Sequence, residues 1–177
     1  MLGALLRSSL ARIIPIGMIL LALQTTLFVE MQPFGVIIQV VLTFAACAGA
    51  VGGPDRGGIT GFVLGLMVDL SIGTPLGSTS ISMGLAGYVA GWCDVIRVET
   101  TWWFAMIFVT LGAAVGEIAV PVVDRFIGVD NAFVPETATI VPVVAVGAAV
   151  LSIPLVPVAR WALKLRGPEI KLPAHET

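Results

Sequence analysis

Two acidic residues, Asp69 and Glu117, lie within long apolar segments of this chain. An ionised carboxylate near the centre of a bilayer costs about 2.5–3.5 kcal/mol, so acids in such segments usually face the protein interior. At a helical rise of about 1.5 Å per residue, Asp69 lies about 16 Å and Glu117 about 24 Å from the predicted start of its helix. Gln24 lies about 18 Å along the first apolar segment. Given the orientation derived below, all three residues are expected in the outer half of the membrane.

Hydroxyl side chains gather at the start of the segment that follows Asp69. One interpretation is an outer polar pocket that takes a ligand or a partner's side chain, formed by Gln24, Asp69, Ser78, Thr79, Ser80 and Glu117. The other is a set of interhelical hydrogen bonds, with Ser78 and Thr79 capping their own helix. A specific expectation is that the Asp69 carboxyl accepts hydrogen bonds from backbone N–H groups or hydroxyls around Gly77 to Ser80, because free N–H groups at a helix start favour an acceptor.

The remaining reactive residue types form no pattern typical of an enzyme. The sequence has no Ser/His/Asp set, no nucleotide-binding loop and no pair of carboxylates at a catalytic spacing. Cys47 and Cys93 lie in apolar stretches without metal-ligand spacing, and the single histidine, His175, is in the polar tail. A net charge of −2 and the lack of a basic stripe argue against nucleic acid. We therefore expect no catalytic residue, no cofactor and no metal.

The composition places these residues in a membrane protein. Apolar residues make up 58% of the chain and charged residues 11%, whereas ordinary soluble domains carry about 25% charged residues. A bilayer span needs roughly 20 apolar residues. We predict an all-α, polytopic, single transmembrane domain over 1–177 with a polar cytoplasmic tail at 162–177, and six spans near 13–29, 36–51, 59–72, 79–92, 101–123 and 139–161.

Basic residues set the predicted orientation, because Lys and Arg accumulate on the cytoplasmic side. With six spans and a cytoplasmic N-terminus, Arg125 alone lies outside, and the inner side holds Arg7, Arg12, Arg56, Arg97, Arg160, Lys164, Arg166 and Lys171. The four tryptophans fall at predicted inner ends, where such rings sit among headgroups. We expect a multi-pass protein with both termini in the cytoplasm and the loop around Asp130 outside.

Glycines recur every fourth residue in three predicted spans. They are Gly57, Gly61 and Gly65, then Gly87 and Gly91, then Gly112 and Gly116. Small residues at this spacing let membrane helices approach closely. Packing within one chain is the favoured interpretation, and a dimer or partner surface is the alternative.

The segment from Gly61 to Gly77, GFVLGLMVDLSIGTPLG, and the later Gly-Tyr-Val-Ala-Gly resemble the MreD family of bacterial rod shape-determining proteins. The matching residues are Gly61, Gly65, Asp69, Pro75, Leu76, Gly77, Gly87, Tyr88 and Gly91. The resemblance implies a non-enzymatic component of the cell-wall elongation (rod) complex in the bacterial cytoplasmic membrane. It also implies an MreC-like membrane partner, in a complex with MreB, RodA and a penicillin-binding transpeptidase.

The fold implied by this resemblance is similar to that of the substrate-binding subunits of energy-coupling-factor vitamin transporters. A small-molecule-binding subunit of such a transporter is therefore the alternative function, and the outer polar residues suit it. The sequence lacks an aromatic-rich outer loop to cover a vitamin. A neighbouring gene for an MreC-like protein or for a transporter ATPase would discriminate between the two functions.

Overall fold

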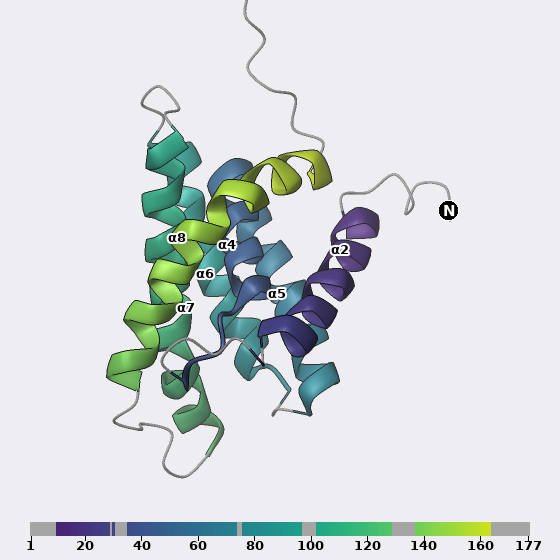
Figure 1. Ribbon diagram of the computed structural model, residues 1–177, viewed down its shortest axis with the longest axis vertical. Helices are drawn as coiled ribbons and strands as arrows, with labels where there is room; N and C mark the ends of the chain where they lie inside the picture. Colours follow the sequence, from purple (N-terminus) through teal and green to yellow (C-terminus); the bar gives the residue numbers. More distant parts are fainter. Residues whose placement is uncertain are drawn as a thin grey trace, which may run out of the picture.

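The computed structural model describes residues 10–28, 30, 35–73, 76–96, 102–128 and 137–163. These ranges contain helices and no strand, which confirms the all-α class (Figure 1). In chain order the elements are α2 (Leu10–Leu23), the π-helical turn η1 (Gln24–Phe28), α4 (Val40–Gly52), α5 (Pro54–Ile72), α6 (Ser78–Val95), α7 (Trp102–Ile127) and α8 (Thr137–Ala162).

Two predicted helix starts differ from the structure. Residues 36–39 are not helical, so the helix expected over 36–51 begins at Val40. The helix expected over 59–72 begins at Pro54 and has 19 residues. Proline suits the first turn of a helix, where its missing N–H is no loss. Gly53, with φ of +87°, makes the sharp turn that separates α4 from α5.

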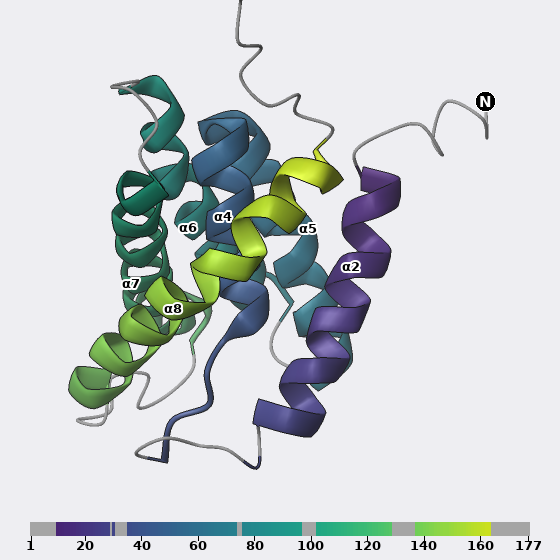
Figure 2. The same cartoon turned by 45° about the horizontal axis from the view of Figure 1, so that its top comes forward.

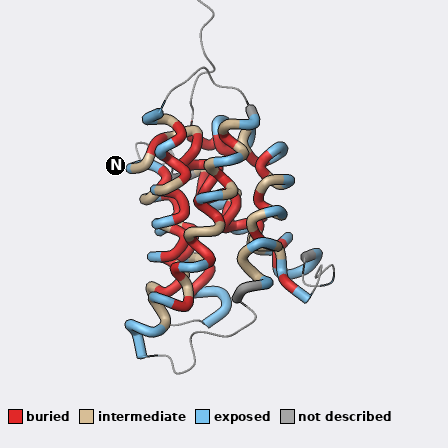
Figure 3. The backbone as a smooth tube through the Cα atoms, turned by 90° about the vertical axis from the view of Figure 1, so that its left-hand side faces the viewer, coloured by how far each residue is buried: buried red, intermediate tan, exposed pale blue. Residues whose placement is uncertain are grey.

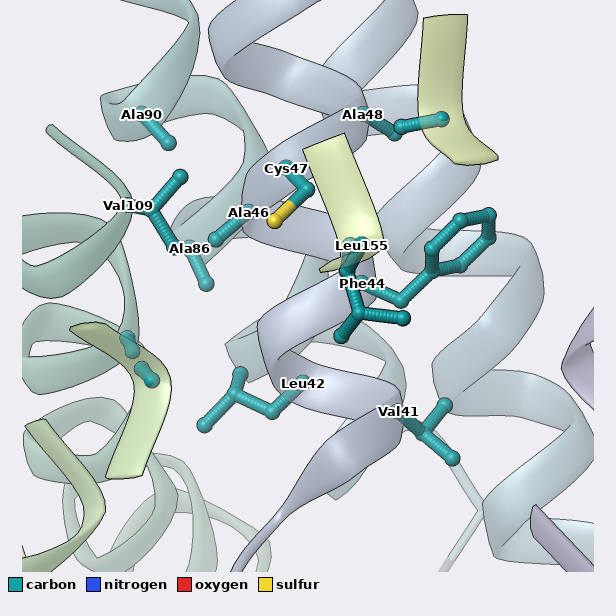
Figure 4. Close-up of a cluster of buried hydrophobic side chains, with 14 of the residues drawn as sticks. Val41, Leu42, Phe44, Ala46, Cys47, Ala48, Ala86, Ala90, Val109 and Leu155 are labelled. Atoms are coloured by element: carbon teal, nitrogen blue, oxygen red, sulfur yellow. The ribbon is translucent and has the colours of Figure 1, made fainter. Parts of the chain in front are cut away.

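Helix α4 is the centre of the bundle. Its sequence has no charged residue, and every side chain from Val40 to Ala50 is buried. It contacts α2, α5, α6, α7 and α8, and α8 crosses obliquely over it (Figure 2). Buried positions run along the inner faces of the surrounding helices (Figure 3). The close-up shows Leu42 and Phe44 of α4 near Leu155 of α8, with Val109 of α7 on the other side (Figure 4).

The spaced glycines lie where helices of this chain touch. A Cβ atom at Gly61 would overlap the carbonyl oxygen of Met83, and one at Gly87 would overlap that of Gly57. One at Gly112 would come within 2.6 Å of the carbonyl oxygen of Ala86. Such close backbone contacts require residues without a side chain. Packing within one chain, the favoured interpretation, is therefore confirmed at these positions.

Two described helices are long and apolar enough to cross a membrane. They are Trp103–Ile127 within α7 and Thr139–Ala162 within α8. Arg12–Leu27 and Val40–Gly52 are shorter apolar helices. Many large apolar side chains face outward on every helix except α4, among them Met18, Ile19, Ile59, Leu70, Ile81, Leu111, Ile118, Val146, Val150 and Ile153.

The helix ends form two distinct faces, the basic end and the turn end. At the basic end, the guanidinium of Arg12 on α2 lies 5.4 Å from the ring centroid of Trp161 on α8. A Cβ at Gly52 would contact both Leu163 and Arg56, which places the α4–α5 turn at the same end. The opposite turn end holds the α5–α6 turn and the last turns of α7, because Ser78 bonds to Asp124 there.

Candidate functional site

Asp69 is the most connected polar residue of the turn end. It lies in the last turn of α5, and its side chain is only 1% exposed. Its backbone oxygen accepts the N–H of Gly73, and Gly73 itself has a left-handed backbone conformation and ends the helix. Its carboxylate accepts backbone N–H groups from Gly77 (3.0 Å), Thr79 (3.2 Å) and Ser80 (3.2 Å), and the Ser80 hydroxyl at 2.8 Å.

This contact is a helix cap supplied by a neighbouring helix. The first N–H groups of a helix have no partner within the helix, and the N-cap residue of α6, Gly77, has no side chain that could serve them. Asp69 fills that role, and the positive end of the helix dipole favours its charge. The expected hydrogen bonds between Asp69 and Gly77–Ser80 are confirmed. The suggestion that Ser78 and Thr79 cap α6 themselves is wrong, because the cap comes from α5.

Ser78 instead joins α6 to α7. Its hydroxyl donates to a carboxylate oxygen of Asp124, which lies three residues after Pro121 in the last part of α7. Its backbone oxygen accepts the hydroxyl of Ser82 at 2.9 Å. The span predicted over 101–123 stops before Asp124, but α7 continues to Ile127, so Asp124 lies on a helix. The hydrogen bond between Ser78 and Asp124 therefore depends on the last turn of α7, which the predicted span leaves out.

Gln24 caps α4 in the same way that Asp69 caps α6. Its side-chain oxygen accepts the N–H of Val41 at 3.1 Å, and the residue is buried. The N-cap position of α4 is Gln39, whose side chain makes no cap of its own. Gln24 lies in η1, the π-helical turn that follows α2. A wider turn of this kind is common where a side chain has a special task.

Glu117 is held by Gln39 across the bundle. The Gln39 amide donates to a Glu117 carboxylate oxygen at 2.8 Å, and Glu117 is buried on α7. The sequence predicted Gln39 inside a helix and gave it no role. Because residues 36–39 are not helical, the Gln39 side chain is free to point at α7.

The six residues proposed for an outer polar pocket thus have separate tasks. The Asp69 carboxylate accepts hydrogen bonds from Thr79 and Ser80, and Ser78 bonds to Asp124. Gln24 bonds to the start of α4, and Glu117 bonds to Gln39. Each contact links two helices or caps a helix start. The Asp69 carboxylate already accepts four hydrogen bonds and is therefore a poor general base. Among the described residues, no three His, Cys, Asp or Glu side chains are placed to hold a metal.

The residues that carry the family resemblance fall into two groups. Gly61, Gly65, Gly87 and Gly91 pack at the α5–α6 contact, and Asp69 and Gly77 form the cap. Leu76 and Tyr88 are instead exposed, by 68% and 43%. Pro75 lies outside the described residues. Comparisons of the chain with protein-family models, with curated proteins and with solved structures found no match.

Proposed function

We propose that this chain is a multi-pass protein of the bacterial cytoplasmic membrane with six spans and both termini in the cytoplasm. The apolar side chains that cover the outside of the bundle support this proposal, because a soluble protein rarely exposes so much apolar surface. Arg12, Arg56 and Arg160 at the basic end, with Arg125 at the turn end, agree with a cytoplasmic basic end. The exposed rings of Trp92, Trp103 and Trp161 also belong to helix ends on the basic side.

The short α4 is compatible with this arrangement. Its 13 residues rise about 20 Å, less than the roughly 30 Å of hydrocarbon. The non-helical residues 36–39 would then enter the membrane, which is tolerated only where protein buries the backbone. Directly after this segment Gln24 accepts the N–H of Val41, and within it Gln39 is anchored to Glu117. At this helix start a polar side chain accepts the hydrogen bond that water would accept in solution.

We infer further that the chain is a non-enzymatic component of the rod complex that elongates the cell wall and that it binds an MreC-like partner. The observation that carries this inference is the cap between Asp69 and Gly77–Ser80. Six of the nine residues of the MreD-like motif, namely Asp69, Gly77 and the four packed glycines, build one connection between α5 and α6. MreB, RodA and a penicillin-binding transpeptidase would be reached through the same complex.

Leu76 is the motif residue best placed to meet a partner. It precedes the cap at the turn end, which is the outer face in the proposed orientation, and its side chain is 68% exposed. Packing within this chain therefore does not explain a leucine at this position. An MreC-like partner carries its large part outside the cytoplasm, on the same side.

A crosslinking experiment tests this function. A photoreactive amino acid at position 76, in a chain produced together with the MreC-like protein of the same genome, should yield a crosslink between the two. Position 126 is the matched control, because Phe126 is 87% exposed, lies at the same end and is not a motif residue. No crosslink from 76, together with no recovery of the MreC-like protein on purification of the chain, would refute the proposed function.

The transporter alternative has less support. Gln24 and Asp69 belong to the outer polar residues expected to suit a ligand, and both are engaged by backbone N–H groups of this chain. A vitamin would have to compete with those contacts, each of which serves a helix start. Recovery of a transporter ATPase with the purified chain would reverse this preference.

A further inference from the structure

Arg12 occupies an unusual position at the basic end. It is the first described polar residue of α2, yet its guanidinium is held by α8: it lies 5.4 Å from the centre of the Trp161 ring and donates to the Trp161 backbone oxygen at 3.4 Å. Stacking on an aromatic ring fixes the plane of a guanidinium. A guanidinium has several N–H donors, and only one of them is used here. The remaining donors are therefore presented in a fixed orientation.

The charge of Arg12 is not neutralised within the described ranges. No carboxylate there forms an ion pair or a hydrogen bond with it, since its recorded contacts are those with Trp161. Asp55 and Asp94 also lie at the basic end, but on α5 and α6. Trp161 is 63% exposed beside it, and Arg160 precedes it in the last turn of α8. An arginine on an exposed tryptophan at a helix end is typical of headgroup level in a bilayer.

Exposed apolar residues continue from Arg12 along α2. Positions three, four and seven residues further share its helix face, and they are Pro15, Ile16 and Ile19, of which Pro15 and Ile19 are exposed. This face of α2 therefore presents apolar atoms on the outside of the bundle, next to the guanidinium.

The same pattern leads away from Trp161 on α8. Positions three, four and seven residues before it are Val158, Pro157 and Pro154, and all three are exposed. Positive charge at one level with apolar surface beneath it on both helices matches the layout of an anionic phospholipid, with its phosphate above its acyl chains.

We propose that Arg12 and Trp161 form a binding site for the phosphate of an anionic phospholipid in the cytoplasmic leaflet, whose acyl chains lie on the exposed faces of α2 and α8. This site rests on the membrane-spanning part of the proposed function and is independent of the MreC-like partner. The bound lipid joins α2 to α8, which otherwise meet mainly through Arg12 and Trp161. Charge complementarity favours a phosphate that carries net negative charge over a zwitterionic headgroup.

Native mass spectrometry of the purified chain tests the site. The protein in mild detergent is mixed with phosphatidylglycerol or with phosphatidylethanolamine of the same acyl chains, and the retained lipid is counted. We expect phosphatidylglycerol to be retained preferentially, and R12Q to reduce its apparent affinity by about fivefold. R12K should fall between the two, because it keeps the charge without the planar fork. The matched control R125Q, at the opposite end, should bind as the unchanged chain does.

Two results would overturn the site. One is equal retention of the two lipids by the unchanged chain, which needs no variant and so does not depend on the folding of R12Q. The other is unchanged retention of phosphatidylglycerol by R12Q. The assay contains no partner protein, so a failed crosslink at position 76 would refute the partner proposal and leave this site standing.

Discussion

Two buried polar side chains in this bundle, Asp69 and Gln24, are placed where other helices begin. In water, solvent satisfies the free N–H groups at a helix start, whereas in an apolar interior a protein group must do so. Asp69 serves the start of α6, and Gln24 serves the start of α4. Asp69 lies on α5, which directly precedes α6, and Gln24 lies in η1, which directly precedes α4, so each cap also fixes the direction in which the chain returns.

The Asp69 cap predicts a graded response to substitution. Asp69→Leu leaves several N–H donors of α6 unpaired, each costing about 1–3 kcal/mol, so a severe loss of stability is expected. Asp69→Asn keeps one acceptor oxygen but turns an NH₂ group toward a donor, so a milder loss is expected. Thermal unfolding in detergent measures both variants. Ser71→Ala is the control, because the Ser71 hydroxyl is exposed and bonds only to its own helix at Met67.

Cell-shape complementation separates stability from a function that requires the charge. Variants that fold and insert but fail to complement, for both Asn and Leu, would point to a role for the carboxylate beyond the cap. A Leu variant as stable as the unchanged chain would contradict the cap itself.

Gly77 gives a second prediction at the residue scale. Its φ is +104°, a conformation that costs a residue with a side chain about 1–3 kcal/mol. Gly77→Val should therefore lower the unfolding temperature and weaken recovery of the MreC-like partner, since the turn also positions Leu76. Leu76→Ala changes the neighbouring exposed side chain without backbone strain and should leave stability unchanged. Equal unfolding temperatures for Gly77→Val and the unchanged chain would rule out strain at this turn.

The sequence made the Asp69 contact predictable and left others hidden. An acid late in an apolar segment, followed closely by Pro-Leu-Gly and hydroxyls, has only one nearby helix start to bind. Gln39 and Asp124 carry no such local signal, because their partners, Glu117 and Ser78, are distant in sequence. The predicted helix over 36–51 also included Gln39, which is not helical, and the predicted span over 101–123 stopped before Asp124, which is.

Among the elements, α5 and α6 form the most intimate pair. Gly61 and Gly87 face backbone atoms of the opposite helix, so the two axes are close. Gly58 also lies on α5 and faces α6, but a Cβ atom there would be 3.8 Å from the nearest atoms and would overlap none of them. The four-residue glycine spacing therefore predicted the crowded positions, and Gly58, which lies outside that series, is not crowded.

This difference gives a matched pair of substitutions. Gly61→Ala forces its methyl group against the Met83 backbone and should destabilise the fold by about 1–3 kcal/mol. Gly58→Ala adds the same methyl group at ordinary van der Waals distance from its neighbours and should be neutral or slightly stabilising, because alanine is the better helix former. The comparison of the two unfolding curves in detergent checks this prediction. A neutral Gly61→Ala would mean that α5 and α6 are further apart than described.

Helix boundaries were less predictable than helix packing. Residues 36–39 are as apolar as α4, so hydropathy could not separate the extended segment from the helix. The distinction depends on Gln24 and Glu117, which hold the start of α4 from other helices. In contrast, Gly53-Pro54 marks the start of α5 locally, and the span predicted from 59 leaves charged Asp55 and Arg56 outside a helix that contains them.

At the scale of the molecule, the two ends differ in kind. The basic end carries Arg12, Arg56 and Arg160, and the turn end carries the Asp69 cap and Asp124. The exposed apolar surface lies between them. The predicted outer loop around Asp130 and the tail from 164 lie outside the described residues, so described positions are better reporters of orientation. Asp55 and Phe126 are both exposed and lie at opposite ends.

Cysteine labelling at these two positions tests the orientation. In a chain whose buried Cys47 and Cys93 are replaced by alanine, Phe126→Cys should react with a membrane-impermeant thiol reagent in intact cells or spheroplasts. Asp55→Cys should react only after the membrane is permeabilised, because the positive-inside rule places the basic end in the cytoplasm. Labelling of both variants after solubilisation in detergent controls for reactivity. Equal labelling before permeabilisation would exclude a fixed transmembrane orientation, and labelling of Asp55→Cys alone would invert it.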